Sequence, residues 1–211
     1  MSAEGAGGKP IVTSQNELRD HFGKVSALAE KKVLDHLDKF CRDFIALSPF
    51  LIIASSDGNG HSDASPRGDA PGFVAVIDRK ILLIPDRRGN NRVDTFGNIL
   101  AAPGVGIIFM VPGINETLRV NGRAKITQDP ALLTPLTVQG IVPNIGLKIE
   151  VEQCYFHCGK ALMRAKLWSP AAQVERDRFP SLGRIIAEQT AAVGVEEAEK
   201  TMEEAYRTRL Y

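Results

Sequence analysis

The fold of this chain is indicated first by one alternating stretch, Leu118-Arg119-Val120-Asn121-Gly122-Arg123-Ala124-Lys125-Ile126. Its apolar side chains fall on one face of an extended chain, and its basic and amide side chains fall on the other. This period of two predicts a long strand with one buried face.

Shorter apolar runs on both sides of this stretch predict further strands. A hairpin is expected around the turn Asp57-Gly58-Asn59-Gly60, because Asx and glycine residues suit tight connections. At least six short strands predict a mainly β, α+β fold, an antiparallel barrel or sandwich with flanking helices. A Rossmann sheet is disfavoured because crossover helices do not alternate regularly with the strands. The predicted strands outside the first stretch are Phe50–Ala54, His61–Arg67, Phe73–Ile77, Lys80–Ile84, Val105–Val111 and Leu147–Glu152.

Helical spacing of apolar residues appears outside these strands. We predict a disordered tail at residues 1–13, a barrel domain with N-terminal helices at 14–170, and a helical extension at 171–211. The segments with helical character are Ser14–Leu47, Asn90–Ala101, Pro130–Gln139 and Val195–Arg207.

Composition limits the partners and the compartment. The 211 residues contain 26 Lys and Arg against 25 Asp and Glu, so no broad field attracts nucleic acid or an anionic membrane. No segment approaches the ~20 apolar residues of a spanning helix. Three cysteines do not form a disulfide framework, which predicts a reducing cytoplasm.

The stretch with the most chemistry is Ile81-Leu82-Leu83-Ile84-Pro85-Asp86-Arg87-Arg88-Gly89-Asn90-Asn91-Arg92. A buried strand runs into a loop with three arginines, and a helix is expected over Val93–Ala101. The N–H groups at a helix start and arginine forks both suit phosphate oxygens. Taken alone, the stretch fits an anion site and a merely solvated loop equally well, and Asn90 or Asn91 is the candidate for the helix N-cap.

Two other segments carry related residues. Arg67 is expected at a strand end, where it could reach the same anion, although Ser65–Asp69 taken alone favours a polar turn with an Arg–Asp pair. In an extended Leu162–Trp168, the side chains of Arg164, Lys166 and Trp168 would share one side, which suits the rim of a flat anionic ligand. An alternative interpretation makes Trp168 a closing residue of the core.

The order of these segments resembles the pyridoxamine 5′-phosphate oxidase-like FMN-binding split-barrel family, in particular a bacterial subgroup of probable FMN-dependent enzymes. The resemblance extends from about Phe44 to Pro170. The segments that carry it are Ser65-Pro66-Arg67-Gly68-Asp69, Ile84–Arg92 with Asp94–Leu100, Leu118–Ala124, and His157-Cys158-Gly159-Lys160-Ala161 through Trp168.

The resemblance implies a six-stranded antiparallel split β-barrel and a homodimer with two FMN molecules at the subunit interface. It implies that the Leu118–Ala124 strand joins the dimer contact and that Arg164, Lys166 and Trp168 approach the flavin from the partner subunit. The cofactor-binding residues expected in this way are Ser65, Arg67, Ile84, Pro85, Asp86, Arg87, Arg88, Asn91, Arg92, Arg164, Lys166 and Trp168.

The function predicted is that of an FMN-dependent oxidoreductase with a small-molecule substrate. The chain after Trp168 differs from the substrate-phosphate-binding end of the vitamin-forming oxidases, so a different substrate is expected. A flavin-binding or redox-sensing protein without turnover is one alternative. A split barrel that binds haem or a deazaflavin is another, and His61 or His157 is the haem ligand to test.

Other site classes are disfavoured. Cys154, His157 and Cys158 do not converge on a strand, because His157 points away from the two cysteines, so no metal site is predicted. No serine or cysteine has a nucleophile motif, and no Walker or dinucleotide fingerprint is present.

Overall fold

The structure is a computed structural model that describes residues 11–211, so most of the predicted disordered tail lies outside the described residues. The chain divides into two compact units, Met1–Val33 and Leu34–Tyr211. In the first unit lie α1 (Gln15–Phe22) and α2 (Ala27–Lys31). Each begins at a serine whose hydroxyl accepts a backbone N–H, Ser14 for α1 and Ser26 for α2.

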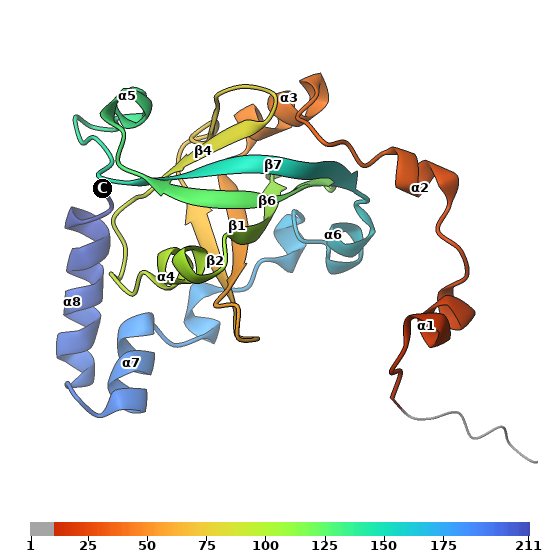
Figure 1. The fold of residues 1–211 in the computed structure, drawn as a ribbon. Coiled ribbons are helices and arrows are strands. Elements are labelled where there is room, and N and C mark those ends of the chain that lie inside the picture. The colour runs from red at the N-terminus through yellow and green to blue at the C-terminus, as the bar shows by residue number, and fades with distance from the viewer. Residues whose placement is uncertain (1–10) are drawn as a thin grey trace, which may run out of the picture. The chain divides into compact units, whose positions relative to one another are not determined.

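The second unit is built on one antiparallel sheet of seven strands in the order β2-β1-β5-β6-β7-β4-β3 (Figure 1). The sheet is not closed, and the predicted mainly β, α+β class is confirmed. There are seven strands rather than six because the two-residue β3 extends one edge. The strands are β1 (Phe50–Ser56), β2 (Ser62–Gly68), β3 (Ala75–Val76), β4 (Ile81–Pro85), β5 (Gly104–Met110), β6 (Thr117–Thr127) and β7 (Gly146–His157).

The predicted hairpin is present as β1 and β2, which pair from Phe50 with Gly68 to Ser56 with Ser62. In its turn, the Asp57 carboxylate accepts the Asn59 N–H at 2.7 Å. Pro66 has no N–H to donate, but β2 is an edge strand, where this costs little.

The predicted strand at Phe73–Ile77 is mostly wrong. Its first residues turn instead, since the Phe73 N–H donates to the Ala70 carbonyl and Gly72 has a φ of 81°. Phe73 and Val74 are buried in the core outside any strand.

The alternation in β6 and β7 is confirmed and explains the long central pair. Leu118 and Val120 are fully buried and Arg123 is exposed. The register shifts at Gly122, where an added Cβ would lie 2.1 Å from the Glu150 carbonyl oxygen. Glycine is therefore required at this crossing, and the bulge in β7 keeps both halves of that strand facing the core.

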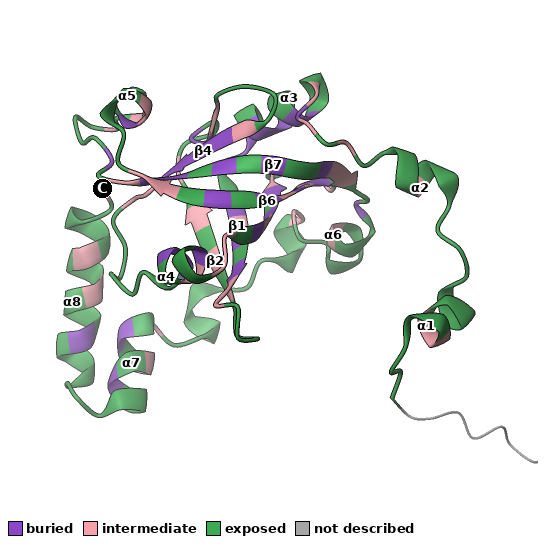
Figure 2. Ribbon diagram, in the orientation of Figure 1, coloured by how far each residue is buried: buried purple, intermediate pink, exposed green. Residues whose placement is uncertain are grey.

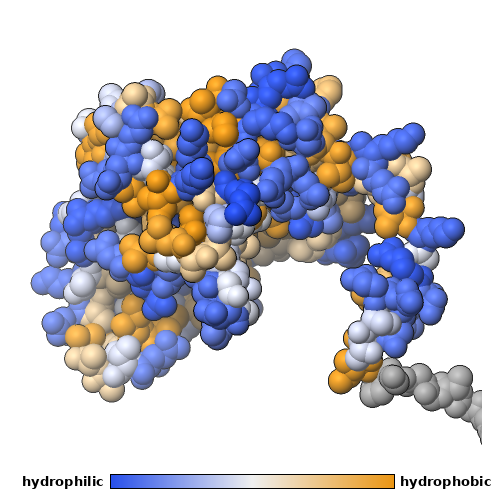
Figure 3. All heavy atoms as spheres, in the orientation of Figure 1, coloured by the Kyte–Doolittle hydropathy of each residue, from blue (hydrophilic) through white to orange (hydrophobic). Residues whose placement is uncertain are grey.

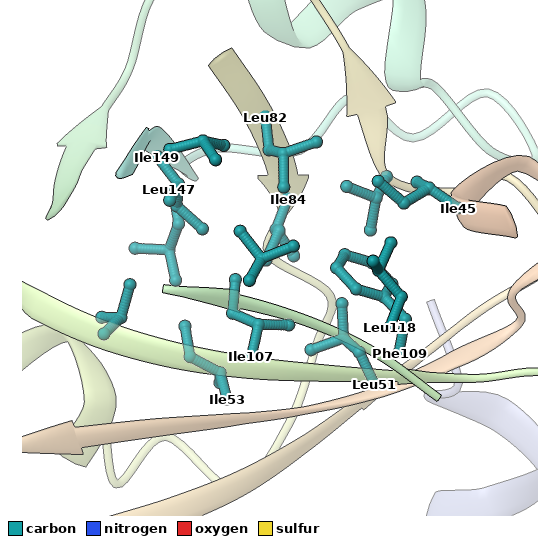
Figure 4. Close-up of a cluster of buried hydrophobic side chains, with 14 of the residues drawn as sticks. Ile45, Leu51, Ile53, Leu82, Ile84, Ile107, Phe109, Leu118, Leu147 and Ile149 are labelled. Atoms are coloured by element: carbon teal, nitrogen blue, oxygen red, sulfur yellow. The ribbon is translucent and has the colours of Figure 1, made fainter. Parts of the chain in front are cut away.

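The core lies on one face of this sheet. Figure 4 shows side chains from β1, β4, β5, β6 and β7 converging there, with Ile45 of α3 (Lys39–Leu47) at one side. Figure 2 shows buried and exposed residues alternating along β6 and β7. Burial of these apolar groups is the main stabilising contribution to the fold.

Helices cap this sheet and continue the chain beyond it. The predicted extended stretch Leu162–Trp168 is wrong, because Lys160–Ala165 forms a helix of residues with high helical propensity. The predicted helix near Pro130 is present but short, and the one from Val195 is confirmed. In the second unit the helices are α3 (Lys39–Leu47), α4 (Asp94–Ala101), α5 (Pro130–Leu133), α6 (Lys160–Ala165), α7 (Leu182–Thr190) and α8 (Val195–Thr208), with 3₁₀ turns at Thr134–Leu136, Pro170–Ala172 and Arg176–Arg178.

The helical pattern predicted over Ser14–Leu47 is therefore split into α1, α2 and α3. Asp38 caps α3, and its carboxylate accepts the Cys41 N–H at 2.8 Å. Three capping residues in one region explain why the spacing does not yield a continuous helix.

The helices α7 and α8 form a hairpin and lie side by side in Figure 1. It is held close at Gly183, where an added Cβ would lie 2.6 Å from the Glu199 Cα. Among residues 11–211, no helix combines the length and apolar character needed to cross a membrane.

Candidate functional site

The candidate site lies where β4 ends and α4 begins. β4 is buried through Pro85, and the chain then crosses an irregular loop, residues 86–93, before α4 starts at Asp94. Asn91 and Val93 have φ values of 59° and 53°, in the left-handed region. This region is unfavourable for a β-branched residue such as Val93, so the loop is held in a strained conformation.

The predicted N-cap of this helix is wrong. Val93 occupies the cap position rather than Asn90 or Asn91, and its side chain makes no capping hydrogen bond. The Asn90 amide oxygen instead accepts the Arg92 N–H within the loop, at 3.1 Å. The first turn of α4 therefore keeps N–H groups that no cap side chain satisfies.

The loop, the start of α4 and strand β2 enclose a cavity of about 530 Å³. Volumes of this size are typical of small-molecule and cofactor sites. The cavity has apolar wall residues as well as charged ones. It is lined by Asp63, Ser65, Pro66, Arg67, Gly68, Phe73, Pro85, Asp86, Arg87, Arg88, Gly89, Asn90, Asn91, Arg92, Val93, Asp94, Thr95 and Phe96.

Arg67 joins β2 to the start of α4. Its Nη2 donates to the Thr95 Oγ1 at 3.3 Å and its Nη1 donates to the Pro66 carbonyl at 2.9 Å. Burial lowers the pKa of Arg67 from its ordinary value, and the nearby Asp86 and Asp63 act in the opposite direction. Arg67 forms no direct ion pair with a described carboxylate, so its charge is available to a ligand.

Asp63 and Ser65 lie on the same face of β2 as Arg67. The Ser65 hydroxyl donates to the Asp63 carboxylate at 2.9 Å, and the Thr95 hydroxyl lies 3.5 Å from the same oxygen. Thr95 is buried in the first turn of α4. These bonds fix the floor of the cavity.

Arg87 is already committed to the protein. Its Nε donates to the Asp69 carboxylate at 2.6 Å, and the Asp69 side chain is only 1% exposed. Burial opposes ionisation of Asp69, but the Ala70 N–H, the Tyr211 hydroxyl and Arg87 hold its pKa below the ordinary value. Arg87 therefore shapes the loop more than it offers charge.

The remaining charges of the lining differ in availability. Arg92 is exposed and pairs with Asp94 at 2.8 Å, which raises its pKa. Arg88 is exposed and forms no ion pair with the described residues. Burial raises the pKa of Asp86, although Arg67 and Arg87 act in the opposite direction. Arg67 and Arg88 are thus the two uncommitted cations of the cavity.

The structure brings together most of the predicted site residues. Ile84 does not line the cavity, because its side chain is buried in the core. Arg164 in the last turn of α6 and Lys166 at its C-cap are exposed. The Trp168 Nε1 donates to the Ile114 carbonyl at 2.9 Å, away from the cavity lining. The predicted residues that do line it are Ser65, Arg67, Pro85, Asp86, Arg87, Arg88, Asn91 and Arg92.

Four residues that form hydrogen bonds around the cavity were not predicted as site residues: Asp63, Asp69, Thr95 and Tyr211. The sequence signals Asp63, because it precedes Ser65 and Arg67 by two and four positions in one strand. It signals Thr95 as a first-turn polar residue of the expected helix. Asp69 lies in a predicted segment, but nothing marks it as the partner of Arg87 or of Tyr211.

Among the described residues, no group of three or more His, Cys, Asp or Glu side chains is arranged so that it could hold a metal ion. No histidine lines the cavity. His61 bonds to Asp57 at the exposed hairpin turn, and His157 is exposed at the end of β7.

Comparison with known proteins gives one family match. Residues 37–158, more than half of the chain, match the family model described as Pyridoxamine 5'-phosphate oxidase. A search of curated proteins finds no match.

Three bacterial proteins are among the solved structures with some similarity to this chain. HupZ of Group A Streptococcus is 19% identical with a TM-score of 0.46, over 56% of this chain and 92% of that chain. An FMN-binding protein from Syntrophomonas wolfei is 8% identical with a TM-score of 0.43, over 68% and 96%. The FAD binding protein from Mycobacterium smegmatis is 17% identical with a TM-score of 0.39, over 59% and 97%. At these values the three structures carry no argument about this chain.

Proposed function

The chain belongs to the pyridoxamine 5′-phosphate oxidase family, and on that premise we propose that it is an FMN-dependent oxidoreductase with a small-molecule substrate. The observation that carries the proposal is Arg67, a half-buried cation that forms no direct ion pair with the described residues, beside the uncapped start of α4. Both groups favour a phosphate.

The donors of the cavity fit the phosphate of FMN. Arg67 and the N–H groups of α4 would hold it, and Arg92 would join them by sharing its charge with Asp94. Arg87 and Asn91 would shape the loop around it. Phosphate oxygens take several charge-assisted hydrogen bonds at once, which suits this donor set.

The rest of the cavity suits a flat ring system. Phe73, Phe96 and Pro85 supply apolar walls, and Ser65 and Asp86 supply polar groups at its edge. When bound, FMN supplies hydride or electron transfer, and the residues of this chain orient it and exclude water. A separate acid–base constellation is not required for that role.

The test is to purify the protein without added cofactor, record its visible spectrum and identify any released ligand by mass spectrometry. Oxidised-flavin bands and released FMN would support the proposal. A colourless protein that also ignores added FMN would contradict it. A Soret band would favour haem, which no histidine of this cavity would ligate, and a released deazaflavin would favour that alternative.

We also propose that the protein is a homodimer. The outward faces of β1 and β5 are apolar as well as the inward ones, with Phe50 37% exposed and Ile108 36% exposed. Figure 3 shows hydrophobic residues interspersed with hydrophilic ones on the face it draws. Apolar strand faces of this kind favour association with a second subunit.

In such a dimer, Arg164, Lys166 and Trp168 would approach the flavin of the partner subunit. Light scattering on the FMN-loaded protein tests the assembly: the mass of two chains is expected, and the mass of one chain would contradict the dimer.

A further inference from the structure

A second cavity, of about 380 Å³, adjoins the loop that lines the first. We call it the Tyr211 cavity. One side of it is made by the proposed cofactor loop, through Asp86, Arg87, Arg88 and Asn91. The other side is Ile141-Val142-Pro143-Asn144 together with Tyr211, and none of these residues lines the first cavity.

The walls of the Tyr211 cavity are held in place by hydrogen bonds. Val138 and Ile141 exchange backbone hydrogen bonds of 3.2 and 2.9 Å, which close the turn before the 141–144 segment. The Asp86 N–H donates to the Ile145 carbonyl at 3.0 Å, which ties this segment to the end of β4. Backbone hydrogen bonds therefore hold the 141–144 segment and connect it to the end of β4, on the other side of the cavity.

Tyr211 is fixed through the same carboxylate that holds Arg87. Its hydroxyl donates to the Asp69 Oδ1 at 2.8 Å, while Arg87 donates to the Asp69 Oδ2. The Arg87 guanidinium lies 6.0 Å from the centre of the Tyr211 ring. The Tyr211 hydroxyl is therefore bonded to Asp69, and the aromatic ring forms an apolar wall of the cavity.

The lining combines an apolar surface with one cation that forms no ion pair within residues 11–211, Arg88, and with the Asp86 carboxyl group, which Arg67 and Arg87 attract. Ile141 is 52% exposed and Val142 is 43% exposed, large fractions for aliphatic side chains in a small cavity. Arg88 forms no ion pair with the described residues, whereas Arg87 is neutralised by Asp69. The exposed amides of Asn91 and Asn144 add uncharged hydrogen-bonding groups.

We propose that the Tyr211 cavity binds a small amphipathic organic anion, such as an aromatic or aliphatic carboxylate, which is the substrate if the proposed function holds. The anionic group binds Arg88, and the apolar body lies on Ile141, Val142 and the Tyr211 ring. Charge-assisted bonding to a guanidinium and burial of apolar surface are both needed for affinity.

The test uses 4-fluorobenzoate as the probe and 4-fluorobenzamide as its uncharged counterpart, in fluorine-NMR titrations of the protein as purified. Two variants differ only in charge at the cavity wall, Val142→Glu and Val142→Gln. The wild type should bind the benzoate and prefer it to the benzamide. Val142→Glu should bind the benzoate about tenfold more weakly than Val142→Gln, because a like charge about 5 Å from the ligand repels it.

Three results would overturn the inference: no saturable binding of the benzoate to the wild type, equal binding of benzoate and benzamide, or equal benzoate affinity in the two variants. An FMN titration of each protein, run in parallel, separates this inference from the proposed function. Failure of the wild type to bind FMN while the benzoate results hold would remove the flavin proposal alone. Normal FMN affinity with equal benzoate affinity in the two variants would remove the Tyr211 cavity proposal alone.

Discussion

Two segments of this chain carry several basic residues, and one of them lines both of the cavities described above. Residues 86–92 follow β4, and residues 158–168 follow β7, so each leaves a strand of the same sheet. The first stays irregular, with Asn91 and Val93 in the left-handed region, and lines the first cavity together with the start of α4. The second winds into α6, and its Arg164 and Lys166 are exposed.

The difference follows from local sequence. Lys-Ala-Leu-Met-Arg-Ala consists of residues with high helical propensity, whereas Asp, Gly and Asn in the first segment favour turns and positive φ. A count of cations therefore does not identify an anion site. An anion site is better identified by cations without an ion pair that lie beside the free N–H groups of a helix start, and Arg67 and Arg88 are such cations among the described residues.

The largest effect is expected from removing Arg67, the β2 cation that lines the first cavity together with residues 86–92. Arg67→Ala should weaken FMN binding by about 1.5–3 kcal/mol, the scale of a hydrogen bond to a charged group. Arg92→Ala should cost less, because Arg92 is exposed and already paired with Asp94. Fluorescence titration of FMN measures both.

Arg178→Ala is the matched control for this titration, since Arg178 is exposed and lines neither cavity. If Arg67→Ala and Arg178→Ala bind FMN equally well, Arg67 does not contribute to FMN binding in the first cavity, and the contrast between the two segments is contradicted.

A second prediction contrasts one glycine from each segment. An added Cβ at Gly159, at the start of α6, would lie 2.7 Å from the Asn115 Cβ, whereas at Gly89 the nearest atom is 3.9 Å away. Gly159→Ala should lower the free energy of unfolding by about 1–3 kcal/mol through overpacking. Gly89→Ala should change it by no more than about 0.5 kcal/mol, as for an open surface position.

Urea denaturation of the two variants measures this contrast. Equal stabilities would show that the second segment is not packed more tightly than the first.

The smallest effect is expected at Asp86, whose pKa burial raises from its ordinary value of 3.8. The carboxylate is less favourable in the folded chain than in the unfolded chain. Stability is therefore lost as the pH rises from 3.8 through the raised pKa, and the loss persists at neutral pH. Asp86→Asn should raise the melting temperature at pH 7, and the difference from wild type should shrink as the pH falls toward 4.

Thermal unfolding of the cofactor-free protein across this pH range provides the measurement. A lower melting temperature for Asp86→Asn at pH 7 would mean that attraction to Arg67 and Arg87 outweighs burial.

The sheet could be predicted well from the sequence because its signals are local. The alternation in Leu118–Ile126 and the Asp57–Gly60 turn each determine a strand or a hairpin through neighbouring residues alone. The failures also have local causes. The apolar run at Phe73 and Val74 predicts a strand, but these residues follow a turn at Gly72. Val93 takes the N-cap position of α4 for which the asparagines were the predicted residues.

The site could be predicted only in part. Arg67 and residues 85–92 line one cavity because the fold places β2 next to the β4–α4 loop. The order of the motifs along the chain predicted this proximity. The Asp69–Tyr211 bond joins residues 142 positions apart, and the Trp168–Ile114 bond joins residues 54 positions apart. No spacing rule links such residues, so only the folded chain shows that Asp69 is shared by Arg87 and Tyr211.

The central claim is that the first cavity recognises a phosphate group. Its most direct test compares the affinities of the wild-type protein for FMN and for riboflavin, which has the same ring system and lacks the phosphate. We expect FMN to bind at least about tenfold more tightly, because one charge-assisted bond is worth about 1.5 kcal/mol or more. Equal affinities for FMN and riboflavin would contradict the account.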